Sequence, residues 1–513
     1  MAETVQQDDS SDFNLVPAGN WQPDVPAPTN EGLISGLNLV PRATGLYGPE
    51  RQPTTAFSQS VTPFGSALKA HGQFHSSSLL QGQTTRFYVG TFATGSGDSH
   101  IVAQPEDDAW VDLSRAGGYT ITAFQPWAFA NFGLLALAAN RVTPIQVSDG
   151  IGGIFADVPD SPRCSDIAEV AGFLVGIRPD DTVFGEGTQD FRVTWSAIGD
   201  AENWPDPTST EAINVQSGFR DLLGGGPLRR VIPGIGGADA VIISGRKIWR
   251  MNFVGPPAIW RFDQVENDQG CEIPGMVATF NETAFFLGHN GFYWFDGQNA
   301  TPIGQGEMDD FFINDVTFSS TFGFQNQAVS AVDSVNKNYV VGYRNSAALD
   351  DHNNRILRFN WLTRQWSNSA QSADVMGSLS NRASLIDSPT LHVMGANFQT
   401  AKFEGATLEA TIETREIFHQ GGQRTRIKSV LPLVDTDSVD VKMRTRERIS
   451  QTPVESVERT FCNHGNVRFD PTVVEGRFYR AFLTIAAAAE WTAYQGLQYE
   501  VTPWSYGPKV PPP

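Results

Sequence analysis

Short apolar runs, each followed by a turn signal, recur along the chain from about residue 84 onward. Few windows show the 3.6-residue period of an amphipathic helix, so these runs predict β-strands. Arg86–Thr91 is a possible first run, ahead of six clear ones. Those six are Leu134–Ala139, Phe173–Ile177, Val241–Ser244, Ala284–Leu287, Tyr339–Tyr343 and Leu391–Met394.

Several of these runs lead through a turn into an aromatic strand. The segment His289–Gly291, which contains an Asn-Gly step, precedes the aromatic Phe292–Phe295. Asn-Gly steps readily supply the positive φ angles that tight hairpins need. A repeat of about 45 residues with several strands is typical of a β-propeller blade. We therefore expect an all-β fold with a β-propeller over residues 84–400. It has six blades, or seven if Arg86–Thr91 opens one; an irregular all-β protein is the alternative.

The two ends of the chain have a different pattern. Residues 1–83 begin with a polar, acidic stretch and continue through a Pro-rich segment, Asn20–Asn30. They hold too few apolar residues for a core of their own, so we expect an extended arm that joins another domain. Alternating strands such as Ser438–Thr445 predict a β-sandwich-like platform domain over residues 401–513, ending in a Pro-rich tail.

Composition supports an all-β fold and limits the partners. The 513 residues include 49 Gly and 31 Pro, a surplus that suits turn-rich β-proteins. The formal net charge is -20. Residues 401–513 carry 14 basic and 14 acidic groups, so the whole acidic excess lies before residue 401. Such a chain repels phosphate at long range, which argues against a dedicated nucleic-acid binder.

The sequence predicts a protein made in a reducing cytoplasm. The N-terminus has neither a basic n-region nor an apolar h-region, and no segment has the length of a membrane span. The cysteines Cys164, Cys271 and Cys462 are far apart and form no CxxC pair. A disulfide framework and a Cys-based zinc site are therefore not expected.

Motifs for catalysis, cofactor binding and metal binding are missing. There is no HExxH helix, GxSxG elbow, Walker lysine or sialidase-type SxDxGxTW box. We expect no catalytic, cofactor-binding or metal-ligating residues, no cofactor and no enzymatic activity. Weaker features have ordinary explanations: solvated loops for the close pair His71 and His75 and for three acidic pairs, and a turn for Gly234–Gly237. The acidic pairs are Asp107-Asp108, Asp180-Asp181 and Asp309-Asp310.

Two further groups of side chains are notable. Alternating cations in one predicted strand would share one face, either as a solvated face or as a partner-binding or phosphate-facing stripe. These cations are Lys442, Arg444, Arg446 and Arg448. The tryptophans of strand-like segments are expected to pack between blades. They are Trp195, Trp204, Trp249, Trp260, Trp294, Trp361 and Trp366.

A series of short motifs, in this order, resembles the tail nozzle proteins of short-tailed bacteriophages. These proteins are also called tail tubular protein B and are akin to packaged-DNA stabilisation proteins. The resemblance covers about 400 residues, from Trp127 to Tyr499 and more weakly Leu33 to Gly48. The motifs are WSAIGDAENW (Trp195–Trp204), RKIWRMNFVGPPAIWRF (Arg246–Phe262), GFYWFDG (Gly291–Gly297), NWLTRQW (Asn360–Trp366), HGNVRF (His464–Phe469) and GRFYRAFLTI (Gly476–Ile485).

The resemblance implies a structural virion protein, assembled in the host cytoplasm into a homo-hexameric ring of the phage tail. Its partners would be the adaptor above it, tail fibres or a needle, and weakly bound packaged double-stranded DNA in the channel. Two rival functions stay open. A carbohydrate-active β-propeller, either a receptor-degrading tail enzyme or a sialidase-like hydrolase, would need carboxylates, Arg and Tyr clustered at one propeller mouth. A soluble propeller scaffold without a viral role is the other.

Overall fold

The computed structural model describes residues 13–60, 68–73, 75–77, 86–93, 97–105, 110–121, 125–149, 153–181, 187–318, 327–379, 390–395, 399–418, 423–462 and 474–503. Strands dominate these ranges, which confirms the all-β expectation. Their helical elements are α1 (Thr210–Val215), α2 (Asp309–Asp315) and the 3-10 turn η2 (Pro274–Met276). None of the helices in these ranges has the length and apolar character that crossing a membrane would require.

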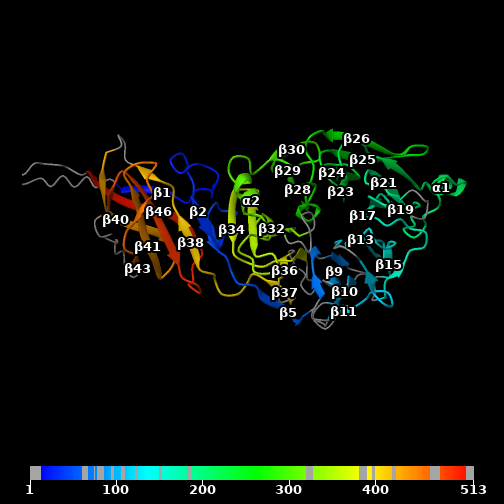
Figure 1. Cartoon of the computed structure of the whole chain (residues 1–513), viewed down its shortest axis with the longest axis horizontal. Coiled ribbons are helices and arrows are strands. Elements are labelled where there is room, and N and C mark those ends of the chain that lie inside the picture. The colour runs from blue at the N-terminus through cyan, green and yellow to red at the C-terminus, as the bar shows by residue number, and fades with distance from the viewer. Residues whose placement is uncertain are drawn as a thin grey trace, which may run out of the picture.

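Seven sheets form a β-propeller, numbered here as blades 1 to 7 along the chain (Figure 1). Blade 1 holds β6 (Leu68–Ala70), β8 (His75–Ser77), β9 (Arg86–Ala93), β10 (Asp98–Pro105), β11 (Val111–Asp112) and β12 (Tyr119–Thr120). Blade 2 holds β13 (Ala128–Phe132), β14 (Leu135–Ala139), β15 (Gln146–Ser148) and β16 (Ala156–Asp157). Blade 3 holds β17 (Asp166–Val170), β18 (Phe173–Ile177), β21 (Arg192–Trp195) and β22 (Gly218–Asp221), with a small hairpin of β19 (Asp180–Asp181) and β20 (Gly187–Thr188).

The remaining blades complete the ring. Blade 4 holds β23 (Leu228–Pro233), β24 (Ala240–Ser244), β25 (Ile248–Gly255) and β26 (Ile259–Glu266). Blade 5 holds β27 (Ala278–Phe280), β28 (Thr283–Gly288), β29 (Gly291–Phe295) and β30 (Ala300–Pro302). Blade 6 holds β31 (Val329–Asp333), β32 (Asn338–Tyr343), β33 (Arg355–Asn360) and β34 (Gln365–Ser369). Blade 7 holds β7 (Gly72–Gln73), β35 (Val375–Leu379), β36 (Thr390–Met394), β37 (Gln399–Lys402) and β5 (Thr54–Ser60).

Each predicted apolar run becomes the second of the main strands of its blade, counted from the centre of the ring. In blade 7 the main strands are β35, β36, β37 and β5, and β7 is an additional strand at the inner edge of β35. All residues of β18 and β24 are buried, because neighbouring blades cover both faces of a second strand. Arg86–Thr91 lies in β9, the second strand of blade 1. The propeller therefore has seven blades, a number that the sequence left between six and seven.

Strands from the N-terminal part of the chain close the propeller ring. β5 pairs antiparallel with β37 as the outermost strand of blade 7, and β7 pairs parallel with β35 at its inner edge. Residues 1–83 were expected to form one extended arm that joins the platform. Their strands β5 to β8 instead belong to propeller sheets. A ring needs its last blade tied to its first, and only a strand from the other end of the propeller segment supplies that pairing.

The platform is a sandwich of two antiparallel sheets, at the opposite end of the molecule from α1 (Figure 1). One sheet contains β3 (Leu39–Pro41), β4 (Tyr47–Pro49), β46 (Tyr494–Pro503), β40 (Thr425–Val434), β44 (Val474–Gly476) and β1 (Phe13–Pro17). The other contains β2 (Ser35–Leu37), β38 (Ala410–Glu413), β45 (Phe478–Ile485), β41 (Ser438–Arg446), β42 (Val454–Glu455), β39 (Ile417–Phe418) and β43 (Arg459–Cys462). Buried and half-buried residues alternate strictly along β45, as one face covers the shared core.

Residues 13–50 join the platform to the propeller. They supply β1 to β4 to the sandwich, and β2 and β3 also contact β34 of blade 6. The Tyr47 hydroxyl donates to the Trp366 carbonyl at 2.9 Å. Arg358 of blade 6 forms a buried ion pair with Glu50, and the Ser369 hydroxyl also donates to Glu50. One hydrophobic cluster runs from the platform into blades 5 and 6, so the two parts share a core.

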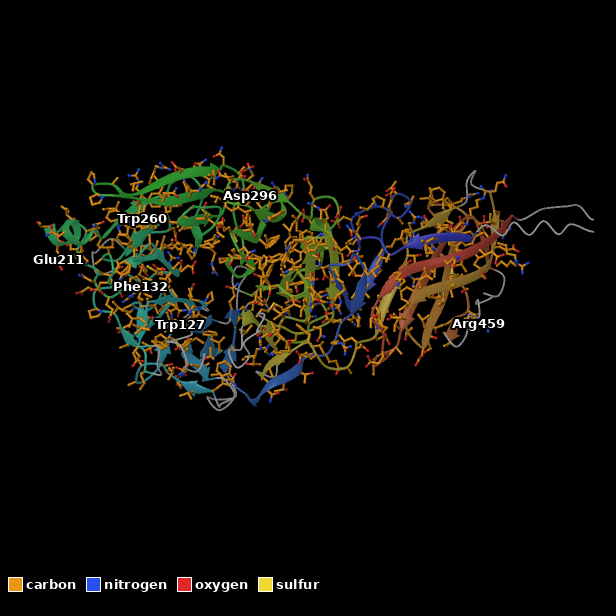
Figure 2. All side chains as sticks on the ribbon, turned by 180° about the vertical axis from the view of Figure 1, so that it is seen from behind. Trp127, Phe132, Glu211, Trp260, Asp296 and Arg459 are labelled. Carbon is orange, nitrogen blue, oxygen red and sulfur yellow. The ribbon has the colours of Figure 1, made fainter. Side chains whose placement is uncertain are left out.

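Tryptophan side chains fill the spaces between blades, as expected. Trp127 meets the Tyr119 ring edge-on at 4.8 Å between blades 1 and 2, and its indole N–H donates to Ser99. Figure 2 shows Trp127 and Trp260 within the propeller. Trp260 of blade 4 lies 5.2 Å from the Phe173 ring of blade 3. Five of the seven tryptophans named from the sequence are buried, and Trp294 and Trp361 are half-buried against the core.

Candidate functional site

The centre of the propeller contains a polar cavity of about 490 Å³. The first strand of every blade contributes to its wall: β8, β13, β17, β23, β27, β31 and β35. Gln73, at the end of β7, ties three blades together there. Its side-chain amide donates to the carbonyls of Val277 and Ser330, each at 3.0 Å, and its oxygen accepts from Arg230 at 3.5 Å. All seven blades therefore meet around this central cavity.

The two histidines expected in a solvated loop are instead part of the propeller interior. His71 is buried, and one of its ring nitrogens lies 2.7 Å from the Gln327 carbonyl oxygen. His75 lines the channel, stacks on Phe129 at 5.8 Å and bonds Asn131 at 3.0 Å. The expectation was wrong because closure of the ring carries this polar segment between blades 7 and 1.

The carboxylates of the channel wall do not form the pair that a glycosidase uses. Among the described wall residues they are Glu169, and Asp166 at one end. Glu169 accepts from the Gly172 backbone N–H at 2.9 Å. Asp166 accepts from the Val231 backbone N–H and is ion-paired with Arg230, so both carboxylates hold the backbone or an arginine in place. The described wall includes no tyrosine.

The acidic pairs named from the sequence have local structural roles where they are described. Asp180 accepts from Thr188 across the small hairpin of blade 3. Asp309 and Asp310 open helix α2, where Asp309 accepts from the Phe292 backbone N–H at 3.0 Å. Burial, together with the nearby carboxylates Asp24 and Asp310, raises the pKa of Asp309 to about 6, although the hydrogen bond from Phe292 acts in the opposite direction. The pair Asp107-Asp108 lies outside the described residues.

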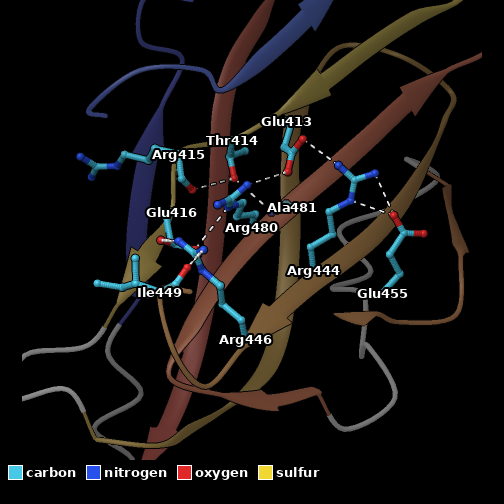
Figure 3. Close-up of polar contacts among 10 residues, drawn as sticks. All are labelled: Glu413, Thr414, Arg415, Glu416, Arg444, Arg446, Ile449, Glu455, Arg480 and Ala481. Atoms are coloured by element: carbon cyan, nitrogen blue, oxygen red, sulfur yellow. Dashed lines mark hydrogen bonds and ion pairs between the residues drawn. The ribbon is translucent and has the colours of Figure 1, made fainter. Parts of the chain in front are cut away.

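The predicted cationic stripe is an internal ion-pair network on the platform (Figure 3). Arg444 binds Glu413 at 2.7 Å and Glu455 at 2.8 Å, and Arg446 binds Glu416 at 2.7 Å. Arg480 of the adjacent strand β45 reaches both Glu413 and Glu416. Three arginines thus face three glutamates.

The proposed phosphate-facing role of the stripe is therefore wrong for Arg444 and Arg446. Their guanidinium groups bind carboxylates supplied by β38, by the segment after it and by β42. Lys442 pairs with Glu458 at 3.1 Å. Strand β41 ends at Arg446, so the exposed Arg448 is not on the same strand face.

Other candidate features have no chemistry of their own in the described part of the chain. Gly234–Gly237 forms the turn between β23 and β24, as expected. The thiols of Cys164 and Cys271 are buried, and burial raises the pKa of Cys271 to about 12, which leaves it protonated and unreactive. No three His, Cys, Asp or Glu side chains gather as a metal site within the described ranges.

One cluster of arginines in the folded chain was not predicted from the sequence. Arg178, Arg229 and Arg230 meet at one end of the channel, where they line a second cavity beside Asp166. Arg178 comes from the loop after β18, and the other two come from β23. The Arg229-Arg230 step was the only signal, because the third cation lies about 50 residues earlier in a different blade.

Several solved structures show similarity to the chain, whereas no family model and no curated protein sequence matches it. BamB from Moraxella catarrhalis is 10% identical, with 72% of this chain and 97% of that chain covered and a TM-score of 0.33. YCF48 from Cyanidioschyzon merolae is 11% identical, over 66% and 98%, with a TM-score of 0.34. The dihydro-heme d1 dehydrogenase NirN is 9% identical, over 90% and 81%, with a TM-score of 0.35. These are similarities of fold alone, and the chain is an all-β protein with a β-propeller.

Proposed function

We propose that this chain is a structural virion protein, a subunit of the tail nozzle ring of a short-tailed phage. The ring lies below the portal and adaptor, retains the packaged DNA and conducts it during ejection. The motifs between Trp195 and Ile485, in their order, support this assignment by resemblance.

The path of the N-terminal segment supports a rigid structural role, because it connects the platform to the propeller. Residues 13–50 are built into both platform sheets, and β5 and β7 close the propeller immediately afterwards. The platform and the propeller cannot separate without breaking strand pairing or the buried contact between Glu50 and Arg358. Such a chain suits a wall that must resist the pressure of packaged DNA.

The charge distribution supports a conduit that does not hold DNA tightly. Six copies carry a formal charge of about -120, and all of this excess comes from residues before 401. Acidic groups that face the channel of the ring repel the duplex, with screening over about 8 Å at physiological salt. Weak contact lets the genome slide during ejection.

Native mass spectrometry of the purified full-length chain tests the ring. We expect a species of six times the chain mass, because the nozzle role needs closed cyclic symmetry. A chain that stays monomeric at tens of micromolar, alone and with its adaptor, would contradict the proposal.

Two further measurements separate the nozzle from its rivals. Affinity for double-stranded DNA at about 150 mM salt should be weak, and nanomolar binding with a steep salt slope would exclude a slippery conduit. The purified protein should hydrolyse neither glycans nor phosphoesters. Glycan turnover that is lost in a Glu169→Gln variant would instead establish a carbohydrate-active propeller.

A further inference from the structure

A groove lies between the outermost strands of blades 3 and 4. Its volume is about 580 Å³, and two unbroken runs of the chain line it, residues 217–220 at β22 and residues 257–262 at β26. In the described chain, each of these strands is the last one of its sheet and pairs on one side only. We call this groove the rim groove. It presents two open strand edges to a segment that enters it.

The register of β22 shows which of its backbone groups point outward. The Leu222 N–H donates to the Phe191 carbonyl at 2.8 Å, so the main-chain groups of Leu222 point toward blade 3. These directions alternate along a strand, and the register between β21 and β22 is unbroken, so the N–H and carbonyl of Phe219 point away from β21. An extended chain in the rim groove can therefore continue the sheet through Phe219.

Aromatic side chains form the walls of the rim groove. Trp195 and Trp260 are buried, and their rings meet edge-on at 6.4 Å. Phe219 also lines the groove and is 39% exposed. An exposed ring beside buried ones is an apolar surface that a partner's side chains can cover.

The charged side chains among the described lining residues are arginines, Arg220 and Arg261, and both are exposed. Arg261 pairs with Asp263 at 2.7 Å, yet its side chain is still 62% exposed. The sign of this lining is opposite to the net charge of the chain, which is -20. An acidic segment of another copy is therefore attracted to the rim groove.

We propose that the rim groove binds residues 1–12 of a second copy of the chain as an added β-strand. This segment, MAETVQQDDSSD, carries four carboxylates and no basic side chain, and it lies outside the described residues. Its Thr4-Val5 step is β-branched, as strands favour, and stands between Glu3 and the Asp8-Asp9 step. The other chain end, residues 504–513, fits less well, because its four prolines lack an N–H and Lys509 has the charge of the arginines.

The position of the segment favours a second copy over the same chain. Residues 1–12 precede β1 on the platform, whereas α1, whose flanking residues Pro207 and Ser217 line the rim groove, lies at the opposite end of the molecule (Figure 1). Twelve extended residues span at most about 40 Å. A strand passed from one copy to the next makes a head-to-tail contact, which closes into a ring or extends as a filament. The inference does not depend on the tail role.

A synthetic peptide of residues 1–12 tests the rim groove when it is titrated into a chain that lacks residues 1–12 and keeps every described residue. Fluorescence anisotropy should show saturable binding with a dissociation constant below about 100 µM in about 50 mM salt. A peptide with Gln or Asn at its four acidic positions should bind at least about tenfold more weakly. Absence of saturation at about 1 mM would overturn the proposal, and so would tighter binding of a peptide of residues 504–513. This titration needs no ring, so its failure is distinct from the absence of a six-fold species in native mass spectrometry.

Two substitutions at one position separate main-chain pairing from side-chain contact. Phe219→Ala removes the ring, whereas Phe219→Pro also removes the outward N–H and leaves the bonds to β21 in place. We expect the proline variant to bind the peptide at least about fivefold more weakly than the alanine variant. Equal binding by the two folded variants would overturn the added strand.

Charge reversal locates the site. Arg220→Glu should weaken peptide binding at least about tenfold. Arg246→Glu is the matched control, because Arg246 is an exposed arginine of blade 4 that does not line the rim groove. Far-UV circular dichroism and melting temperature confirm the fold of each variant. Equal weakening in the control would show non-specific attraction and overturn the proposal.

Discussion

The platform and the propeller bury arginine side chains in opposite ways. On the platform, Arg444, Arg446 and Arg480 meet three glutamates, so the cluster is neutral and closed (Figure 3). Beside the central cavity of the propeller, Arg230 of blade 4 pairs with Asp166 of blade 3, and Arg178 shares Asp190 with Arg141. The platform arginines hold strands of one sheet together, whereas the propeller arginines join neighbouring blades. Residues of the same type therefore stabilise a sheet in one region and the contacts between sheets in the other.

The two regions also differ in how the chain assembles them. Blades 2, 4, 5 and 6 are each built from four consecutive strands, so their pairing is local. The platform pairs Phe13 with Glu500 and Ser35 with Glu413. Long-range pairing carries a greater entropic cost of loop closure. The platform can therefore form only after both ends of the chain are available.

Deletion of residues 1–48 should have the largest effect. It removes β1 to β4 from both platform sheets and exposes the core beneath them. We expect the platform to lose cooperative unfolding while the propeller keeps its blades and, under the proposed nozzle role, the variant to lose attachment to the phage tail. Differential scanning calorimetry checks this outcome, with deletion of residues 1–12 as the control. A truncated chain that attaches and melts as the native chain does would contradict it.

Arg446→Gln tests the balanced cluster. Glu416, whose side chain is 1% exposed, would lose its closest cation, and breaking a buried pair costs about 3 to 5 kcal/mol. Arg178→Gln is the matched change in the propeller. It should cost less than about 1 kcal/mol, since the side chain of its partner Asp190 is 38% exposed and keeps its ion pair with Arg141. Urea denaturation gives the free energy of unfolding of both variants. Equal losses would contradict the expected difference between the two arginine clusters.

Asp309→Asn should stabilise the protein. Glu416 on the platform is buried beside arginines, whereas the buried Asp309 has the carboxylates Asp24 and Asp310 as neighbours. Because the folded pKa of Asp309 is about 6, protonation favours the fold below the ordinary value of 3.8, and this contribution is lost as the pH rises through 6.

The gain from Asp309→Asn should therefore be about 2 to 3 kcal/mol at pH 8 and vanish below about pH 4. Melting temperatures across this range measure it. Asp310→Asn is the control, since this carboxylate is exposed and its removal should change stability by less than about 0.5 kcal/mol. A pH-independent effect of Asp309→Asn would show that packing, and not charge burial, is responsible.

Lys442→Gln should have the smallest effect. Its partner Glu458 is 46% exposed, and an ion pair so open to solvent contributes less than about 1 kcal/mol. A loss comparable to that of Arg446→Gln would mean that the whole stripe acts as one network.

The sequence by itself determined the parts of the fold that depend on local pattern. The second strand of each blade is buried on both faces, so it reads as a continuous apolar run such as Phe173–Ile177. Turns were visible because Asn-Gly and Gly-rich steps supply positive φ, as at Gly234–Gly237. Outer strands such as β26 gave weaker signals, since most of their residues are exposed or half-buried.

Only the tertiary structure decided which distant segments meet. Three contacts join residues from separate elements. β5 closes blade 7, Glu413 and Glu416 form ion pairs with Arg444 and Arg446, and Arg178 lines the same cavity as Arg229. No local pattern encodes such pairings, because they are set by the closure of a seven-bladed ring and by the return of the N-terminal strands to the platform. The number of blades and the position of Arg178 beside Arg229 follow from that closure.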